Sequence, residues 1–223
     1  MIVDERITAY INSLSVEETP FLEELERTAL QNRVPIIRKE TQSFLKMLVQ
    51  MKRPAQILEI GTAVGFSALL MSEYVDPTCK ITTIENYEKR IPIARENFQK
   101  AGKQEQITLL PGDAMELLKG LSGPYDFMFL DAAKAQYIYY LPELLRMLPE
   151  GGILVTDNVL QDGNVVQSRF AVERRDRTIH ARMRDYLYTI THCEELATSI
   201  LPLGDGVTVS VKKRKTEEGK EEQ

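Results

Sequence analysis

The chain has 223 residues, of which 43% are hydrophobic and 27% charged, a composition typical of a folded globular protein rather than a disordered one. No apolar run approaches the roughly 18 residues of a membrane span, and the first residues lack the basic flank and apolar stretch of a signal peptide. The net charge of -5 excludes a bulk nucleic-acid coat but permits a local basic patch. Two cysteines, Cys79 and Cys193, are too few for a disulfide framework or a zinc cluster, so we expect reduced thiols in a cytoplasmic protein.

The spacing of apolar residues predicts the elements in chain order. Helical spacing, as in Ile7, Ile11 and Leu14, runs through the first fifty residues and predicts a helical extension or lid over residues 1–53. Over residues 54–212 short apolar strands alternate with amphipathic helices, which predicts one α/β domain with a mostly parallel sheet and helices on both faces. The expected strands are 56–60, 80–85, 106–110, 125–130 and 152–156, and the expected helices are 66–74, 87–101, 114–121, 137–148 and 169–191.

The end of the chain has a different pattern. Two further strands, 198–202 and 207–212, enclose the turn residues Gly204-Asp205-Gly206. So short a connection predicts an antiparallel hairpin at the edge of the sheet. The remaining residues, 213–223, are almost all charged or polar, and we expect a disordered tail.

Acidic residues lie near the ends of all five strands of the parallel part. They are Glu59, Glu85, Asp113, Asp131 and Asp157. Open α/β sheets bind their ligands beyond the carboxyl ends of the strands, where these residues would meet. Chance placement of polar turn residues explains part of this pattern but not all of it.

The loop after the first strand carries Gly61 and Gly65 with three residues between them. This is neither the dinucleotide fingerprint nor a P-loop, so it permits close backbone approach without a phosphate cradle. Glu85 follows Gly61 by 24 residues and could accept both hydroxyls of a ribose, while Asp113-Ala114 could hold an adenine edge. A nucleoside ligand without phosphates, such as S-adenosylmethionine, fits this set. The alternatives are a plain tight turn and a surface carboxylate.

A second cluster follows the fourth and fifth strands. Asp131, Asp157 and Asn158 offer three hard oxygens, which suit magnesium or calcium and not zinc. The alternative is that these side chains cap the helices that follow. Lys134 lies three residues after Asp131, and beside a divalent cation its ammonium group would lose a proton more easily and could act as a general base. The alternative is a solvated lysine.

Arginines gather after the second cluster. Since arginine suits phosphate contacts, Arg174, Arg175 and Arg177 are candidates for RNA binding at the rim of the site. A solvated helix face or a dimer contact is the alternative. Six arginines fall within sixteen residues: Arg169, Arg174, Arg175, Arg177, Arg182 and Arg184.

Three motifs together resemble the metal-dependent class I O-methyltransferases, which include catechol and caffeoyl-CoA O-methyltransferases. They are Leu58-Glu-Ile-Gly-Thr-Ala-Val-Gly-Phe-Ser67, Asp131-Ala-Ala-Lys134 and Asp157-Asn-Val159, and the resemblance covers residues 34–211. Within the family, the chain is most similar to the bacterial branch that methylates 5-hydroxyuridine in tRNA, although related bacterial enzymes methylate small phenols. The motifs that carry this are Val34-Pro-Ile36, Asp131-Ala-Ala-Lys-Ala-Gln-Tyr137, Asp157-Asn-Val-Leu160 and Pro202-Leu-Gly-Asp-Gly206.

The resemblance implies a Rossmann-like fold with a seven-stranded sheet, a homodimer formed through the N-terminal helices, and a role for each motif residue. Asp131, Asp157 and Asn158 would hold Mg²⁺, and Lys134 would be the base. S-adenosylmethionine would be bound by Ile37 from the lid and by Glu59, Gly61, Ser67, Glu85, Asp113, Ala114 and Asp131. The acidic tail, 217–223, has no counterpart in the family.

This chemistry calls for a substrate with two neighbouring oxygens, because a chelating magnesium ion would both orient them and lower the pKa of the attacking one. Catechols have such a pair, and so does 5-hydroxyuracil. The motifs therefore leave open a tRNA or a small vicinal-dioxygen phenol as substrate. A non-enzymatic binder is disfavoured by the complete set of Asp131, Lys134, Asp157 and Asn158, and a nicotinamide dehydrogenase by the glycine spacing.

Overall fold

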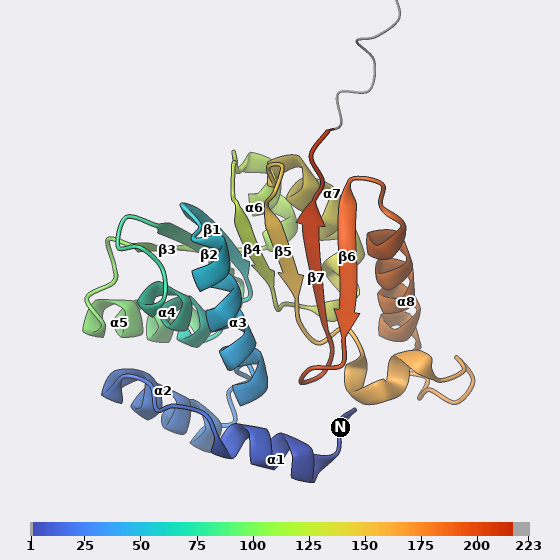
Figure 1. Ribbon diagram of the computed structural model, residues 1–223, viewed down its shortest axis with the longest axis horizontal. Coiled ribbons are helices and arrows are strands. Elements are labelled where there is room, and N and C mark those ends of the chain that lie inside the picture. The colour runs from blue at the N-terminus through green and yellow to red at the C-terminus, as the bar shows by residue number, and fades with distance from the viewer. Residues whose placement is uncertain (1, 216–223) are drawn as a thin grey trace, which may run out of the picture.

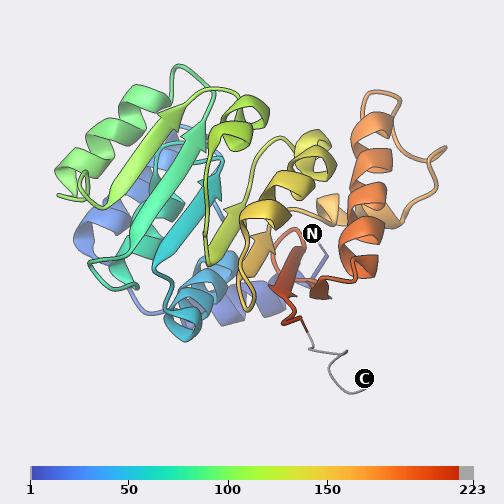
Figure 2. The ribbon, with the colours of Figure 1, turned by 90° about the horizontal axis from the view of Figure 1, so that it is seen from above.

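A seven-stranded sheet forms the centre of the protein in this computed structural model, which describes residues 2–215 (Figures 1 and 2). The strand order is β3-β2-β1-β4-β5-β7-β6; β1 to β5 are parallel, and β7 joins β5 and β6 in antiparallel pairs. The expected mostly parallel sheet with an antiparallel edge hairpin is therefore confirmed. The strands are β1 (Gln56–Ile60), β2 (Lys80–Glu85), β3 (Ile107–Pro111), β4 (Phe127–Leu130), β5 (Ile153–Thr156), β6 (Leu196–Leu201) and β7 (Val207–Lys212).

Helices cover both faces of the sheet, as expected (Figure 2). Successive strand residues point to opposite faces, so Ile57 and Leu58 enter two different hydrophobic cores. One core receives α2 to α5, and the other receives α6 to α8. The helices are α1 (Glu5–Ser13), α2 (Pro20–Gln31), α3 (Lys39–Lys52), α4 (Phe66–Glu73), α5 (Ile91–Lys100), α6 (Ala114–Gly120), α7 (Tyr137–Met147) and α8 (Arg177–His192), with 3-10 turns η1 (Lys134–Gln136) and η2 (Gln161–Val166).

Two helices begin later than the sequence predicts. The helix expected from residue 87 begins at Ile91, because the backbone N–H of Tyr87 is taken by the Glu85 carboxylate and Pro92 favours a first helical turn. The helix expected from residue 169 begins at Arg177. Val172 is buried before it, and the Arg177 guanidinium donates to its carbonyl oxygen, so the chain turns there instead of continuing a helix.

The register of the parallel strands brings their ends to one level. Ile60 pairs with Ile84 on one side and with Leu130 on the other, and Leu130 pairs with Thr156. The residues that follow β1, β2, β4 and β5 therefore emerge side by side at the carboxyl edge of the sheet. The four acidic strand ends that the sequence places there become neighbours through this register.

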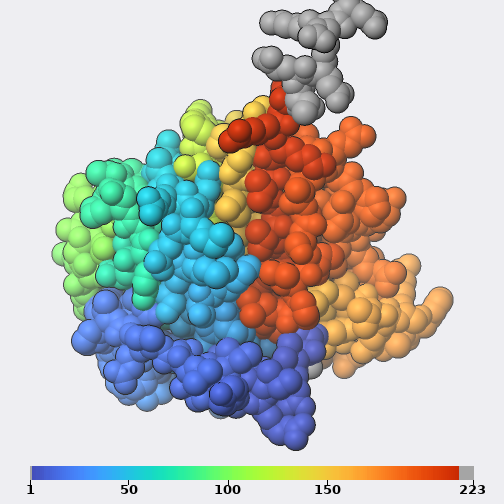
Figure 3. Space-filling view, in the orientation of Figure 1, coloured from blue at the N-terminus to red at the C-terminus, as the bar shows by residue number. Residues whose placement is uncertain are grey.

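The N-terminal helices lie across this same edge (Figures 1 and 3). Residues between α2 and α3 bring Ile37 into one of the two cores, where only 5% of it is exposed. Helix α1 buries none of its residues. Within residues 2–215 no helix is both long and apolar enough to cross a membrane. The tail expected from residue 213 lies, from residue 216 onward, outside the described residues.

Candidate active site

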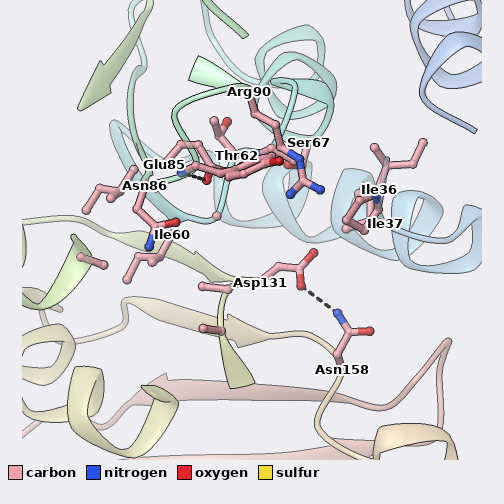
Figure 4. Close-up of a pocket in the computed structure, with 18 of the residues that line it drawn as sticks. Ile36, Ile37, Ile60, Thr62, Ser67, Glu85, Asn86, Arg90, Asp131 and Asn158 are labelled. Carbon is pink, nitrogen blue, oxygen red and sulfur yellow. Dashed lines mark hydrogen bonds between the residues drawn. The ribbon is translucent and has the colours of Figure 1, made fainter. Parts of the chain in front are cut away.

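A cavity of about 410 Å³ opens at the carboxyl edge of the parallel strands, a size suited to a nucleoside-sized ligand (Figure 4). Its walls come from the segments that follow β1, β2, β3, β4 and β5, and from the segment between α2 and α3. Among the residues expected in the site, the cavity is lined by Ile37, Gly61, Ser67, Glu85, Ala114, Asp131, Lys134 and Asn158. Glu59, Asp113 and Asp157 lie close to it but do not line it.

Gly61 allows two strand ends to touch. Its backbone has φ +98°, and a Cβ built there would lie 1.9 Å from the carbonyl oxygen of Asp131. Any side chain would therefore push the end of β1 away from the end of β4. The glycine that marked the loop in the sequence thus keeps Asp131 against the cofactor side of the cavity.

Glu59 lies behind this loop. It is fully buried, and its carboxylate accepts hydrogen bonds from the hydroxyls of Thr62 (2.8 Å), Ser67 (2.5 Å) and Thr83. Burial raises the pKa of Glu59, and the three hydroxyl hydrogen bonds oppose that rise. The carboxylate therefore ties the loop and the start of α4 to the sheet. It shapes the wall of the cavity from behind, where a ligand would not touch it.

Glu85 faces the cavity with a fixed carboxylate. Its two oxygens accept hydrogen bonds from the backbone N–H groups of Ala63 (2.8 Å) and Tyr87 (2.7 Å), and only 7% of the residue is exposed. Each carboxylate oxygen has a second lone pair, so both can still accept a bond from a ligand hydroxyl. This geometry suits a pair of ribose hydroxyls.

Asp113 and Ala114, the residues expected at the adenine, have different roles in the structure. Ala114 is buried and lines the cavity. The Asp113 side chain is exposed and accepts a hydrogen bond from the backbone N–H of Met115 (2.8 Å), which caps α6. Ala114 thus forms part of the wall, and Asp113 holds the helix that carries it.

The sequence analysis missed several residues of the cavity wall. Arg90 lines it beside Tyr87, with its guanidinium 5.0 Å from the centre of the Tyr87 ring. Both fall in a stretch that the apolar spacing assigned to a helix. The structure instead has a turn there, before α5 begins at Ile91, and this turn directs both side chains to the cavity. The nearby Glu85 is the signal that could have found them. The other missed residues include Ile36, Thr62, Asn86 and Tyr140.

The expected metal ligands come together. The Asn158 side-chain amide donates to the Asp131 carboxylate (2.7 Å), as Figure 4 shows, and the Asn158 backbone N–H donates to the Asp157 carboxylate (2.7 Å). Asn158 has φ 61°, a left-handed conformation that asparagine tolerates better than most residues. The turn after β5 therefore directs one amide and one carboxylate towards the end of β4.

The electrostatics of this cluster suit a divalent cation. Burial raises the pKa of Asp131, and burial together with the Asp131 charge raises the pKa of Asp157. Both carboxylates are thus costly to ionise without a positive partner, and their oxygens with the Asn158 amide oxygen form the hard donor set that Mg²⁺ prefers. Within the described chain, no three His, Cys, Asp or Glu residues group as metal ligands, so a cation here would need Asn158.

Lys134 lies on the turn η1 and reaches the same cavity. Its ammonium group forms an ion pair with Asp205 (3.1 Å), which is 4% exposed and comes from the β6–β7 turn. The other Asp205 oxygen accepts from the backbone N–H of Asp162. The sequence analysis included Asp205 in a motif but did not assign it a partner. Asp205 therefore joins the turns that carry Lys134 and the metal candidates.

Replacing Asp205 by asparagine is expected to lower kcat roughly tenfold and to leave the affinity for S-adenosylmethionine, the ligand that the sequence resemblance implies, near that of the wild type. The substituted side chain keeps an acceptor for the Asp162 N–H but loses the charge that holds Lys134 in place. Steady-state kinetics with separate kcat and KM values measure this split. A loss confined to the KM of this nucleoside ligand would contradict the assignment, because it would place Asp205 at the nucleoside subsite beside Glu85.

The arginine candidates differ in their surroundings. Arg175 forms ion pairs with Glu173 (3.0 Å) and Asp176 (3.6 Å). Arg174 is exposed, as is Arg169, and neither has an ion-pair partner within residues 2–215. All of them precede α8, in the segment that was expected to be helical. Arg174 is thus accessible, and Arg175 is partly neutralised.

The remaining arginines hold the site together from α8. Arg177 donates to the Val172 carbonyl oxygen (3.2 Å), and Arg182 donates to the carbonyl oxygen of Ala135 (3.3 Å), in the turn that carries Lys134. These guanidinium groups face protein backbone. Arg177 is therefore a weaker candidate for RNA contact than Arg174.

The family model described as O-methyltransferase matches residues 12–213. The chain belongs to the O-methyltransferase family. A catechol O-methyltransferase of Mycobacterium tuberculosis is 29% identical to this O-methyltransferase over 163 residues, which cover 72% of this chain and 74% of that protein. A nucleoside-sized cavity at the carboxyl edge of the sheet is consistent with this family.

Solved structures agree with this assignment. One solved structure is from Staphylococcus aureus and is described, by inference, as a caffeoyl-CoA O-methyltransferase. It superposes on this O-methyltransferase with a TM-score of 0.86 and 30% identity, over 94% of this chain and 100% of that chain. The methyltransferase PaMTH1 of Podospora anserina, solved with S-adenosylhomocysteine bound, gives a TM-score of 0.84 and 27% identity over 94% and 95% of the chains. The chain is thus an S-adenosylmethionine-dependent O-methyltransferase with the Rossmann-like fold of that family.

Proposed function

We propose that this O-methyltransferase, with Mg²⁺, methylates O5 of 5-hydroxyuridine in the anticodon loop of tRNA. The observation that carries the proposal is the pair of accessible arginines without ion-pair partners in the described chain, Arg169 and Arg174, on the segment that directly follows the metal candidates. Guanidinium groups bind phosphates well, and a loop nucleotide is unpaired enough to enter a cavity at low cost. A free phenol would not need such a rim.

The chain's own residues supply positioning and proton transfer. Glu85 orients the ribose of the methyl donor, and the Gly61 loop sets the sulfonium side of the cavity against Asp131. In the in-line step the S–CH₃ bond breaks, the O–CH₃ bond forms, and the donor leaves as a thioether. The neutral amine form of Lys134 accepts the hydroxyl proton of the substrate and becomes the ammonium group that pairs with Asp205. When bound, Mg²⁺ supplies Lewis-acid chemistry that lowers the pKa of a chelated hydroxyl.

A small phenol with vicinal oxygens is the second candidate substrate. It is favoured by the likeness to the M. tuberculosis relative, a catechol O-methyltransferase. The two candidates share the chemistry of neighbouring oxygens, so Asp131, Lys134, Asp157 and Asn158 serve either one. The two substrates differ only in the contacts that they would make outside the cavity, where a tRNA would extend and a small phenol would not.

The test incubates the protein with methyl-labelled S-adenosylmethionine and Mg²⁺, and offers in parallel tRNA carrying 5-hydroxyuridine and free catechol. We expect label in the tRNA at a much lower substrate concentration, with a rate that falls as salt rises. Transfer of the labelled methyl group only to catechol would overturn the tRNA proposal and establish a small-molecule enzyme. A parallel reaction with EDTA controls for the divalent cation.

We also propose a homodimer formed through α1. Ile7, Tyr10 and Ile11 of α1 and Leu14, which directly follows it, lie at helical spacing, and each is at least 52% exposed. A stripe of this kind on a surface helix usually faces a partner. We expect light scattering to give the mass of a dimer for the wild type, and that of a monomer for Ile11→Glu. Ala9→Glu, on the other side of α1 and exposed, is the control; a monomeric wild type would contradict the proposal.

A further inference from the structure

The loop of residues 161–176 separates the metal candidates from α8. It begins three residues after Asn158 and ends at Asp176, directly before α8. In Figure 1 it lies at the same end of the sheet as α1, and in Figure 3 it projects from the body of the protein beside the β6–β7 hairpin. A macromolecular ligand that covered this end of the sheet would reach the loop as well as the cavity.

The loop presents an aromatic ring to solvent. Phe170 is 87% exposed, the highest value among the large hydrophobic side chains of the described chain, and Val166 is 79% exposed. Neither belongs to either hydrophobic core. A single exposed apolar side chain is ordinary, but two on one loop at the same end of the sheet as the active site form an unpartnered apolar surface.

The loop is fastened to α8, so this exposure does not come from a detached segment. The Arg184 guanidinium donates to the Val165 carbonyl oxygen (3.2 Å), and a ring nitrogen of the buried His180 lies 3.1 Å from the carbonyl oxygen of Gln167. The Arg177 contact with the chain at residue 172 fastens the other end. Phe170 thus stands on a short bridge between two fixed points.

The charge around Phe170 is positive. Arg175 forms ion pairs with Glu173 and Asp176, the two acidic residues that follow Phe170 on this segment, and offsets part of their charge. Arg169 and Arg174 flank Phe170 in sequence, and within the described chain they have no ion-pair partner. An exposed aromatic ring with guanidinium groups close to it in the sequence is a combination that binds single-stranded nucleic acid, where a ring stacks on a base and cations contact phosphates.

We propose that Phe170 is a stacking platform for an unpaired base next to the nucleotide that enters the cavity, with Arg169 and Arg174 at the adjacent phosphates. The proposal rests on the proposed tRNA function and adds the surface that would hold the anticodon loop. A small phenol fits within the cavity and would not reach this ring. Phe170 would therefore contribute to RNA affinity and not to the chemistry of methyl transfer.

The chain contains no tryptophan, so Phe170→Trp introduces a single fluorescent reporter. The probe is an anticodon stem–loop RNA that carries 5-hydroxyuridine. We expect its addition to quench the fluorescence of this variant, since a stacked base quenches indole. Tyr188→Trp is the matched control, because Tyr188 is also exposed (67%) but lies on α8 away from the loop. Quenching that is equal in both variants would overturn the proposal.

Phe170→Ala is expected to weaken binding of the same RNA roughly tenfold, the effect of losing one base–aromatic contact. Phe170→Tyr should restore it, and Tyr188→Ala should leave it unchanged. Thermal unfolding of each variant checks the fold. Equal RNA affinity of Phe170→Ala and the wild type would overturn the platform and leave the tRNA function standing. Dissociation of a dimer by Phe170→Ala would assign the ring to self-association, and a wild type that neither binds nor methylates the RNA would overturn both proposals.

Discussion

Asp157→Asn is expected to lower Mg²⁺-dependent methyl transfer at least a hundredfold, roughly the effect of losing a charged ligand from a catalytic metal site. Asparagine has the same shape and can still accept the hydrogen bond from the Asn158 backbone N–H, so the turn after β5 is retained. What disappears is one of the two negative charges at the strand ends. Since Asp157 does not line the cavity, affinity for S-adenosylmethionine should remain close to that of the wild type.

Calorimetry separates the two effects. Titration with Mg²⁺ alone should show weaker binding to Asp157→Asn, and titration with S-adenosylmethionine should not. Asp185→Asn, an equally conservative change at an exposed position on α8, is the control and should behave as the wild type in both titrations. Unchanged Mg²⁺ affinity in Asp157→Asn would remove this residue from the metal site.

The carboxyl edge of the sheet could be predicted because it depends on regular structure. Runs such as Gln56–Ile60 and Lys80–Glu85 are short and apolar, and the alternation with helices requires the strands to be parallel. Parallel strands bring their ends to one edge, so the proximity of Asp131 and Asp157 followed from the order of the elements alone. Gly61 indicated in the sequence where two strand ends approach most closely, at the Asp131 carbonyl oxygen.

The finer assignments depend on side-chain directions, which the sequence does not contain. Glu59 and Glu85 both occupy the end of a strand, yet one carboxylate turns inward to three hydroxyls and the other faces the cavity. Successive strand residues alternate between faces, but the turn that follows each strand decides which polar group reaches the ligand. The pairing of Lys134 with Asp205 joins positions 71 residues apart, and no local pattern indicates it.

The start of α8 was missed for a related reason. Residues 169–176 contain three arginines, one alanine and one glutamate, all good helix formers, and the sequence indicates a helix through them. Tertiary contacts override this preference, because burial of Val172 and the Arg177 bond to its carbonyl oxygen turn the chain. The consequence is functional: as a loop, the segment exposes Phe170 and Arg174 at the rim instead of aligning them along a helix.

Glu85→Gln is expected to weaken binding of S-adenosylmethionine roughly hundredfold, since hydrogen bonds to a charged acceptor are worth about 1.5–3 kcal/mol each. The amide nitrogen that replaces one oxygen cannot accept from a backbone N–H or from a ribose hydroxyl. It would face either Ala63 or Tyr87, whose N–H groups now donate to the carboxylate. The loss should fall on the KM of the donor, with kcat at saturating donor near that of the wild type.

Glu88→Gln provides the matched control for this variant. Glu88 lies three residues away, is exposed, and does not line the cavity, so the same change of charge there should leave donor binding unaltered. Calorimetry with S-adenosylhomocysteine, which cannot react, measures the affinity apart from turnover. If Glu85→Gln binds this product as tightly as the wild type, Glu85 does not hold the ribose. The carboxylate would then serve only to join the β1 and β2 turns. The nucleoside would have to be oriented by other polar residues of the wall, such as Asn86, Tyr87 and Arg90.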